Sequence, residues 1–199
     1  SAVDSYDGSP AVHSINPYGP RLGASGFLDG DASSGNSIAY TTPSINGFNI
    51  KATRGFDNGT NDATNSIAVK GSVMGVGLAA GVSQLTYKDN ASSAADVDPN
   101  FFTASYSIAG LNLGYAMYDS DNATTNGEET QMGVGTSLMG MGVGVTFAEV
   151  DTATVDTDLM LVSVSKSMGA ASFGLDYLET DASNAAATDT FAFTYVVGF

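Results

Sequence analysis

The sequence contains no cysteine, no tryptophan and only one histidine, and its basic residues number 6 among 199. Without cysteine the chain has no disulfide, no thiol nucleophile and no cysteine-bound zinc. His13 alone cannot supply a histidine metal site, and a serine–histidine triad has almost no material. The acidic residues number 21, so the formal charge is −15, and the basic face that nucleic-acid binding needs is missing. We therefore expect neither a nucleic-acid partner nor an enzyme.

Long apolar runs are absent as well. No stretch of about 18 strongly apolar residues occurs, which excludes a transmembrane helix, and the first residues show no signal-peptide pattern. We therefore expect a mature or processed chain, or one that never entered a secretory route. The hydrophobic share is 43%, which excludes a disordered acidic tail. Residues 1–35 are rich in Gly, Pro, Ser and Asp and are predicted to form one long irregular segment.

From residue 36 onward the sequence consists of short runs in which apolar and small polar residues alternate. Leu111 and Leu113, for example, share one face of a strand, and Asn112 lies on the other. Strict alternation predicts β-strands. The runs 76–87 and 158–166 alternate less cleanly, and their facing stays open. The eleven predicted strands are 37–45, 48–54, 66–74, 76–87, 101–108, 111–118, 130–138, 141–150, 158–166, 171–179 and 190–199.

Two kinds of connector alternate between these strands. The short ones each contain a glycine, which supplies the positive φ of a tight hairpin. The long ones are polar and acidic, so most of the negative charge is expected in the loops and in residues 1–35. The predicted fold is an up-and-down antiparallel meander with tight turns at one end and acidic loops at the other. The tight connectors are 45–48, 74–76, 109–110, 139–140 and 168–170, and the long ones are 55–65, 88–100, 119–129, 151–157 and 180–189.

The composition of the two strand faces indicates a membrane. One face carries Phe, Tyr, Leu, Val and Met, and the other carries mostly Gly, Ala, Ser and Thr. A soluble barrel or sandwich with an apolar interior would place charged or large polar residues on its wet face. The pattern instead favours an all-β transmembrane barrel with lipid outside and water inside. Aromatic residues near the strand ends are expected to form a girdle: Tyr87, Phe101, Phe102, Tyr118, Tyr177 and Phe199.

Two segments resemble the general diffusion porins of Gram-negative outer membranes. The segment 35–55, GNSIAYTTPSINGFNIKATRG, is similar to a porin segment that follows the constriction loop. The C-terminal strand TFAFTYVVGF, with alternating aromatics and a terminal Phe, resembles the signal read by the outer-membrane assembly machinery. The residues of this signal are Phe191, Phe193, Tyr195, Val197 and Phe199.

The resemblance implies a division of the chain. Residues 1–35 would be the constriction-loop segment, and residues 36–199 would be strands six to sixteen of a sixteen-stranded barrel. The chain would thus be the C-terminal two-thirds of a porin, with the first five strands cleaved off, separate or outside this sequence. The resemblance further implies an outer-membrane location, a homotrimer, and passive diffusion of small hydrophilic solutes and ions through a water-filled channel.

Charged residues that face a water-filled lumen are the candidates for solute selection. Lys51 and Lys70 alternate with apolar residues and are predicted to point inward, since a lysine facing lipid would cost on the order of 2–4 kcal/mol. Arg54, at a strand end, is expected at the rim. With so few bases, we predict a weak preference for cations. The candidate constriction and lumen residues are Asp4, Asp7, Asp29, Asp31, Arg21, Lys51, Lys70 and Asp176.

Asp-x-Asp pairs recur at the proposed loop ends. Such pairs can hold Ca²⁺ or Mg²⁺ through oxygen, and divalent ions could bridge the phosphates of lipopolysaccharide, but no full calcium-loop motif follows them. A solvated acidic surface is the simpler interpretation, and no other cofactor is expected. Acidic external loops also leave an alternative function open, that of an adhesin or a structural scaffold that transports nothing. The candidate calcium ligands are Asp96, Asp98, Asp119 and Asp121.

Overall fold

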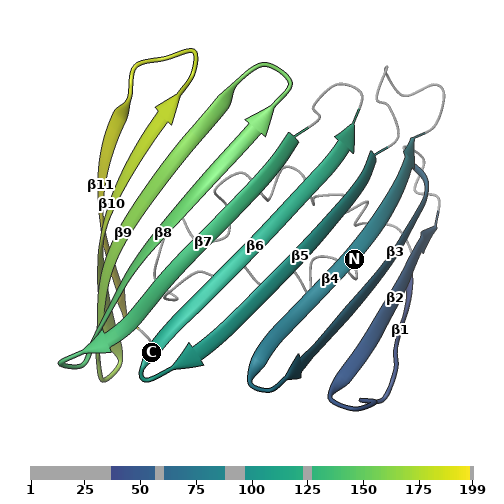
Figure 1. Ribbon diagram of the computed structural model, residues 1–199, viewed down its shortest axis with the longest axis horizontal. Coiled ribbons are helices and arrows are strands. Elements are labelled where there is room, and N and C mark those ends of the chain that lie inside the picture. Colours follow the sequence, from purple (N-terminus) through teal and green to yellow (C-terminus); the bar gives the residue numbers. More distant parts are fainter. Residues whose placement is uncertain (1–36, 57–60, 88–96, 123–126, 198–199) are drawn as a thin grey trace.

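The computed structural model describes residues 37–56, 61–87, 97–122 and 127–197. They form one antiparallel sheet of eleven strands in which every strand pairs with its sequence neighbours (Figure 1). The all-β class, the up-and-down order and the number of strands are therefore confirmed. The strands are β1 (Ser37–Thr41), β2 (Phe48–Phe56), β3 (Asn61–Val73), β4 (Val76–Tyr87), β5 (Val97–Ile108), β6 (Leu111–Asn122), β7 (Gly127–Leu138), β8 (Met141–Thr152), β9 (Asp156–Met168), β10 (Ala171–Ala182) and β11 (Thr188–Val197).

Five tight turns join the strands at one end of the sheet. Four of them place two successive residues at positive φ, the pattern of a type I′ hairpin. In the fifth turn Gly169 has φ 63°, which fits a type II′ turn. The expected glycine is present each time, and the structure adds that a residue other than glycine shares the left-handed conformation in four turns. The four type I′ pairs are Asn46–Gly47, Met74–Gly75, Ala109–Gly110 and Met139–Gly140.

Most strands extend further toward the long connections than the alternation predicted. β7, for example, begins at Gly127, and β3 begins at Asn61. Apolar alternation stops where the outer surface becomes polar, but backbone pairing continues beyond that point because the polar ends of the strands still pair with one another. β1 is shorter than predicted at its tight-turn end: it ends at Thr41, before Pro43, which has no N–H to donate to the ladder.

The described sheet is open. β1 and β11 each have one neighbouring strand, and single-chain barrels of bacterial outer membranes usually have even strand numbers. Figure 1 shows a tilted, curved sheet, as expected for a part of a barrel wall. No helix of the described residues is long and apolar enough to cross a membrane.

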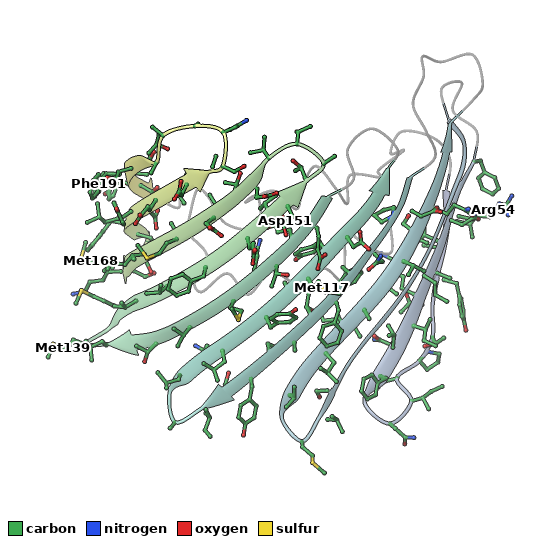
Figure 2. The ribbon with its side chains drawn as sticks, turned by 45° about the horizontal axis from the view of Figure 1, so that its top comes forward. Arg54, Met117, Met139, Asp151, Met168 and Phe191 are labelled. Carbon is green, nitrogen blue, oxygen red and sulfur yellow. The ribbon has the colours of Figure 1, made fainter. Side chains whose placement is uncertain are left out.

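The two faces of the sheet differ in exposure and in chemistry. We call the face with buried small side chains, such as Ala68 and Ser163, the inner face, and the face with exposed apolar side chains, such as Phe147 and Leu175, the outer face. Figure 2 shows Met139 at the tight-turn end and Asp151 toward the other end. An inner cluster of buried residues lies on β3 to β6: Ala68, Ala79, Phe101, Ala116 and Tyr118.

Candidate pore-lining face

The inner face consists mainly of small residues. The structure also settles the facing of the two runs that alternate poorly. On β4, Ala79 and Ser83 are buried on the inner face and Val82 is exposed on the outer face. On β9, Ser163 and Ser165 are buried on the inner face. Small side chains with a hydroxyl or a methyl group project only a short way from the sheet, which suits a surface that borders a lumen.

One transverse row of the inner face carries a base at one end and an acid at the other. Directly opposite residues in an antiparallel ladder share a face. Starting from Lys51 on β2, such partners lead across β3, β4, β5 and β6 to Glu129 on β7. The row is Lys51, Ala68, Gly81, Phe101, Tyr118 and Glu129.

Glu129 is held by the residue that follows it on the same face. The Gln131 amide Nε2 donates a hydrogen bond to Glu129 Oε1, and both side chains are almost completely buried. The second carboxylate oxygen, Oε2, has no hydrogen-bond partner among the described residues. The bond with Gln131 fixes the carboxylate against the wall, so its negative charge has a defined position on the inner face.

The remaining charged residues of the inner face lie on other rows. Asp176 is fully buried on β10, opposite Ser163 on β9 and Ala192 on β11. Lys70 shares its row with Asn49 and Ala79 and is exposed near the tight-turn end of β3. The two lysines therefore belong to β2 and β3, and the two carboxylates belong to β7 and β10.

The chain as a whole matches one protein family. A family model described as Gram-negative porin matches residues 1–198. The chain belongs to the Gram-negative porins. This membership places the protein in the bacterial outer membrane, in a family of transport channels and not of enzymes. No curated protein sequence matches this porin.

Solved structures share the fold of this porin at low sequence identity. A loop L8 deletion mutant of OmpT, an outer membrane protein of Vibrio cholerae, is 18% identical with a TM-score of 0.68, and the match covers 98% of this chain and 72% of that one. The anion-selective porin from Comamonas acidovorans is 17% identical with a TM-score of 0.65, and the match covers 79% of this chain and 55% of that one. This porin chain thus spans about half to three-quarters of the length of these chains.

The predicted aromatic girdle is partly wrong. Phe101 and Tyr118 are 3% and 1% exposed on the inner face, so neither side chain contacts lipid. The period of two explains the error, because Phe101 and Phe102 are adjacent and must face opposite sides. Phe102 and Tyr177 do lie on the outer face of this porin, where Tyr177 packs on Phe191 with ring centroids 5.0 Å apart.

The outer face also carries charge, contrary to the expectation that lipid-facing strand positions are nearly neutral. Its polar end has carboxylates directly opposite one another on neighbouring strands. Four of these carboxylates lie where strands extend into segments that the sequence assigned to loops, and the other two, Glu149 and Asp158, lie at the ends of predicted strands. Residues at i and i+2 of a strand share a face. We call these residues the carboxylate belt: Glu128, Asp151 and Asp156 in one row, and Glu149, Asp158 and Asp181 in the next.

Three of the four predicted calcium ligands, Asp98, Asp119 and Asp121, belong to strands of the described part of this porin. No group of three or more acidic or histidine residues lies close enough to hold a metal ion among the described residues. Asp98 and Asp121 are register partners, and Asp119 accepts a hydrogen bond of 3.1 Å from Asn100 Nδ2. Several predicted residues lie outside the described residues, and their roles stay predictions: Asp4, Asp7, Arg21, Asp29, Asp31, Asp96 and Phe199.

The sequence reasoning missed Glu129 and Gln131 as candidates for the lumen. It placed Glu129 in a loop, because the apolar alternation begins only at Thr130. A usable signal was present: Glu129 and Gln131 continue the spacing of Gly133 and Gly135, two small residues on one face of the same strand. Extending the period of two by one residue, from Thr130 to Glu129, would have placed Glu129 on the same face as Gln131.

Proposed function

We propose that this porin forms a water-filled channel for the passive diffusion of small hydrophilic solutes and ions. The observation that carries the proposal is the contrast between the two faces along the whole wall. Outer positions such as Val134 and Phe147 are apolar and exposed, whereas inner positions such as Thr146 and Ser163 are small and polar. A barrel wall of this kind separates hydrocarbon from an aqueous lumen.

The charge arrangement supports a weak preference for cations. The described inner face has two lysines on one part of the wall, Lys51 and Lys70, and two acidic residues on another, Glu129 and Asp176. Its positive and negative charges are therefore equal in number. The chain carries a net −15, so cations concentrate near its entrances. In a potassium chloride gradient across a planar bilayer, we expect a small reversal potential of the sign that cation selectivity produces. A reversal potential favouring chloride would contradict this part of the proposal.

The open sheet requires partners for both of its edge strands. Unpaired backbone groups of β1 and β11 would be costly in hydrocarbon, so we propose that further antiparallel strands of the same barrel complete the wall. The partial coverage of the similar chains supports this. OmpT of Vibrio cholerae is described in a trimer form, and we propose a homotrimer here as well. Chemical cross-linking of the native protein should yield a band of three protomers, and a monomer alone would overturn the trimer.

Conductance of the folded protein in planar bilayers tests the channel itself. Stepwise insertion with ohmic current is the expected result, because the lumen-facing side chains are small. Heat-modifiable migration in gels should first show that the barrel is folded. A folded barrel that conducts no current would overturn the channel and support the alternative, an adhesin or structural scaffold that acts through its acidic external end.

A further inference from the structure

The tight turns of this porin present apolar side chains at their tips. Met74 is 96% exposed and Met139 is 87% exposed, and their neighbours Val73 and Leu138 are also exposed. Among the central residues of the five turns, only Asn46 has a polar side chain. Turns that lie in water are usually built from Asn, Asp, Ser, Gly and Pro. These tips therefore have the wrong chemistry for an aqueous surface.

At two of these turns, methionine occupies a backbone conformation that it does not favour. Met74 has φ 51° and Met139 has φ 53°, a left-handed conformation that Asn and Gly tolerate and that is unfavourable for most other residues. In the first turn the equivalent position is Asn46, with φ 52°. In water asparagine would be the better residue at all three positions. Methionine is favoured there only if its side chain gains from an apolar environment.

The dimensions of the wall indicate which environment that is. On the outer face of β8 the last apolar side chain is Phe147, and the carboxylate belt begins two residues later at Glu149. Met139 and Glu149 are ten residues apart. At about 3.3 Å per residue and a strand tilt of about 40°, this is a rise of about 25 Å, the usual height of the apolar band of an outer-membrane barrel. When Glu149 lies at one boundary of the hydrocarbon, Met139 reaches the other.

The outer surface is continuous from this band to the turns. Leu138 and Met141 flank the β7–β8 turn, and Val143 and Val145 continue the same apolar surface along β8. On β9 the outer-face Lys166, which is opposite Phe173, lies two residues before Met168. Its long side chain can reach the headgroups from there, as lysines near membrane boundaries do. Lys166 therefore marks the same boundary as the turn tips.

We infer that the methionine-tipped turns of this porin insert into the lipid at the periplasmic boundary of the bilayer, with phospholipid as the occupant around Met74, Met139 and Met168. Short turns of outer-membrane barrels face the periplasm, so the leaflet concerned is the periplasmic one. This role is independent of conduction, because it concerns only the outer surface. The turns act as apolar anchors that set the depth of the barrel in the membrane.

Tryptophan variants test the inference directly: these 199 residues contain no tryptophan, and the unsubstituted protein supplies the reference fluorescence of the strands that complete the barrel. We would purify Met74→Trp and Met139→Trp protein from outer membranes and reconstitute it in vesicles of brominated phosphatidylcholine. Ala153→Trp, in the β8–β9 connection beyond the carboxylate belt, is the matched control. We expect several-fold quenching by bromine and protection from aqueous iodide at positions 74 and 139, and the reverse at 153. Quenching by iodide at all three positions would overturn the inference.

Asparagine substitution gives a second test in which the probe itself does not favour lipid. If the tip lay in water, Met139→Asn would relieve the left-handed strain and raise the midpoint of urea unfolding from vesicles. In lipid, the loss of the apolar contact dominates, and the midpoint falls below that of the wild type. Met139→Leu is the control, which keeps the apolar side chain and should stay near the wild type. A midpoint for Met139→Asn above both would contradict insertion.

Discussion

The ring of Phe101 on β5 lies so close over Gly81 on β4 that a Cβ atom at position 81 would approach Phe101 Cε1 to 2.5 Å. The same Cβ would also meet Ala68 Cβ at 2.9 Å. The three residues are partners in the transverse row that joins Lys51 to Glu129. Glycine at position 81 therefore leaves room for the ring of Phe101 on the inner face.

Replacing this glycine should destabilise the barrel. We expect Gly81→Ala to lower the free energy of unfolding by about 1–3 kcal/mol, since Phe101 must leave its position. Gly77→Ala on the same strand is the control, because its Cβ would meet the Oγ of Ser105, which can rotate away. Urea unfolding from vesicles measures both variants. Equal stability of Gly81→Ala and the wild type would contradict the close packing.

Two adjacent glutamates on β7 should differ in their effect on ion selectivity. Glu129 is buried on the inner face and Glu128 is exposed on the outer face. We expect Glu129→Gln to shift the reversal potential in a potassium chloride gradient toward chloride, because one negative charge leaves the lumen wall. Glu128→Gln removes the same charge from the other side and should leave the reversal potential unchanged. A shift of similar size in both variants would contradict this prediction, because selectivity would then depend on the net charge and not on the face that carries it.

The carboxylate belt should make stability depend on divalent cations. Like charges directly opposite one another on neighbouring strands are destabilising. Chelation of divalent cations by EDTA is therefore expected to lower the thermal midpoint of the protein in vesicles that contain lipopolysaccharide. Asp151→Asn removes the central charge of the Glu128–Asp151–Asp156 row and should reduce this loss. Insensitivity of the wild type to EDTA would argue against bridging by divalent ions.

Replacing alanine by glycine should stabilise the protein at a tight turn and destabilise it within a strand. Ala109 has φ 52° at its tight turn, so Ala109→Gly relieves strain and is expected to stabilise by about 0.5–1 kcal/mol. Ala104 lies within β5, where glycine only adds freedom to the unfolded chain, so Ala104→Gly should destabilise by about 0.5–1 kcal/mol. Denaturant midpoints compare the two. Destabilisation by both changes would contradict the turn geometry.

Two neighbouring residues of β11 allow the predicted assembly signal on the outer face to be tested separately from the inner face. Phe193 is 71% exposed on the outer face of β11, and its neighbour Ala192 points to the inner face. We expect Phe193→Ser to reduce the fraction of folded, heat-modifiable protein in outer membranes several-fold. The adjacent Ala192→Ser keeps the outer face intact and should assemble normally. Equal yields from both variants would count against a role for the aromatic pattern.

Much of the wall was predictable because its signals are local. Each hairpin carries its own turn signal, as in Met139–Gly140, and each strand carries a period of two, as in Met141 to Phe147. The predictions failed where the apolar signal ends. Glu129 and Asp156 lie in paired strands, but their polar neighbours give no alternation that distinguishes a strand from a loop. Phe101 was assigned to the lipid side because residue type was used in place of register.

The sequence alone determined the number of strands, their order and the ends at which they turn, since hairpin chemistry and periodicity act over a few residues. It could not determine which side of a mixed strand faces inward. A period of two indicates which residues share a face, but it does not show whether that face is the inner or the outer one. Only the pairing between neighbouring strands decides this. This pairing places Glu129 on the inner face, Glu128 and Asp151 on the outer face, and Gly81 beside Phe101.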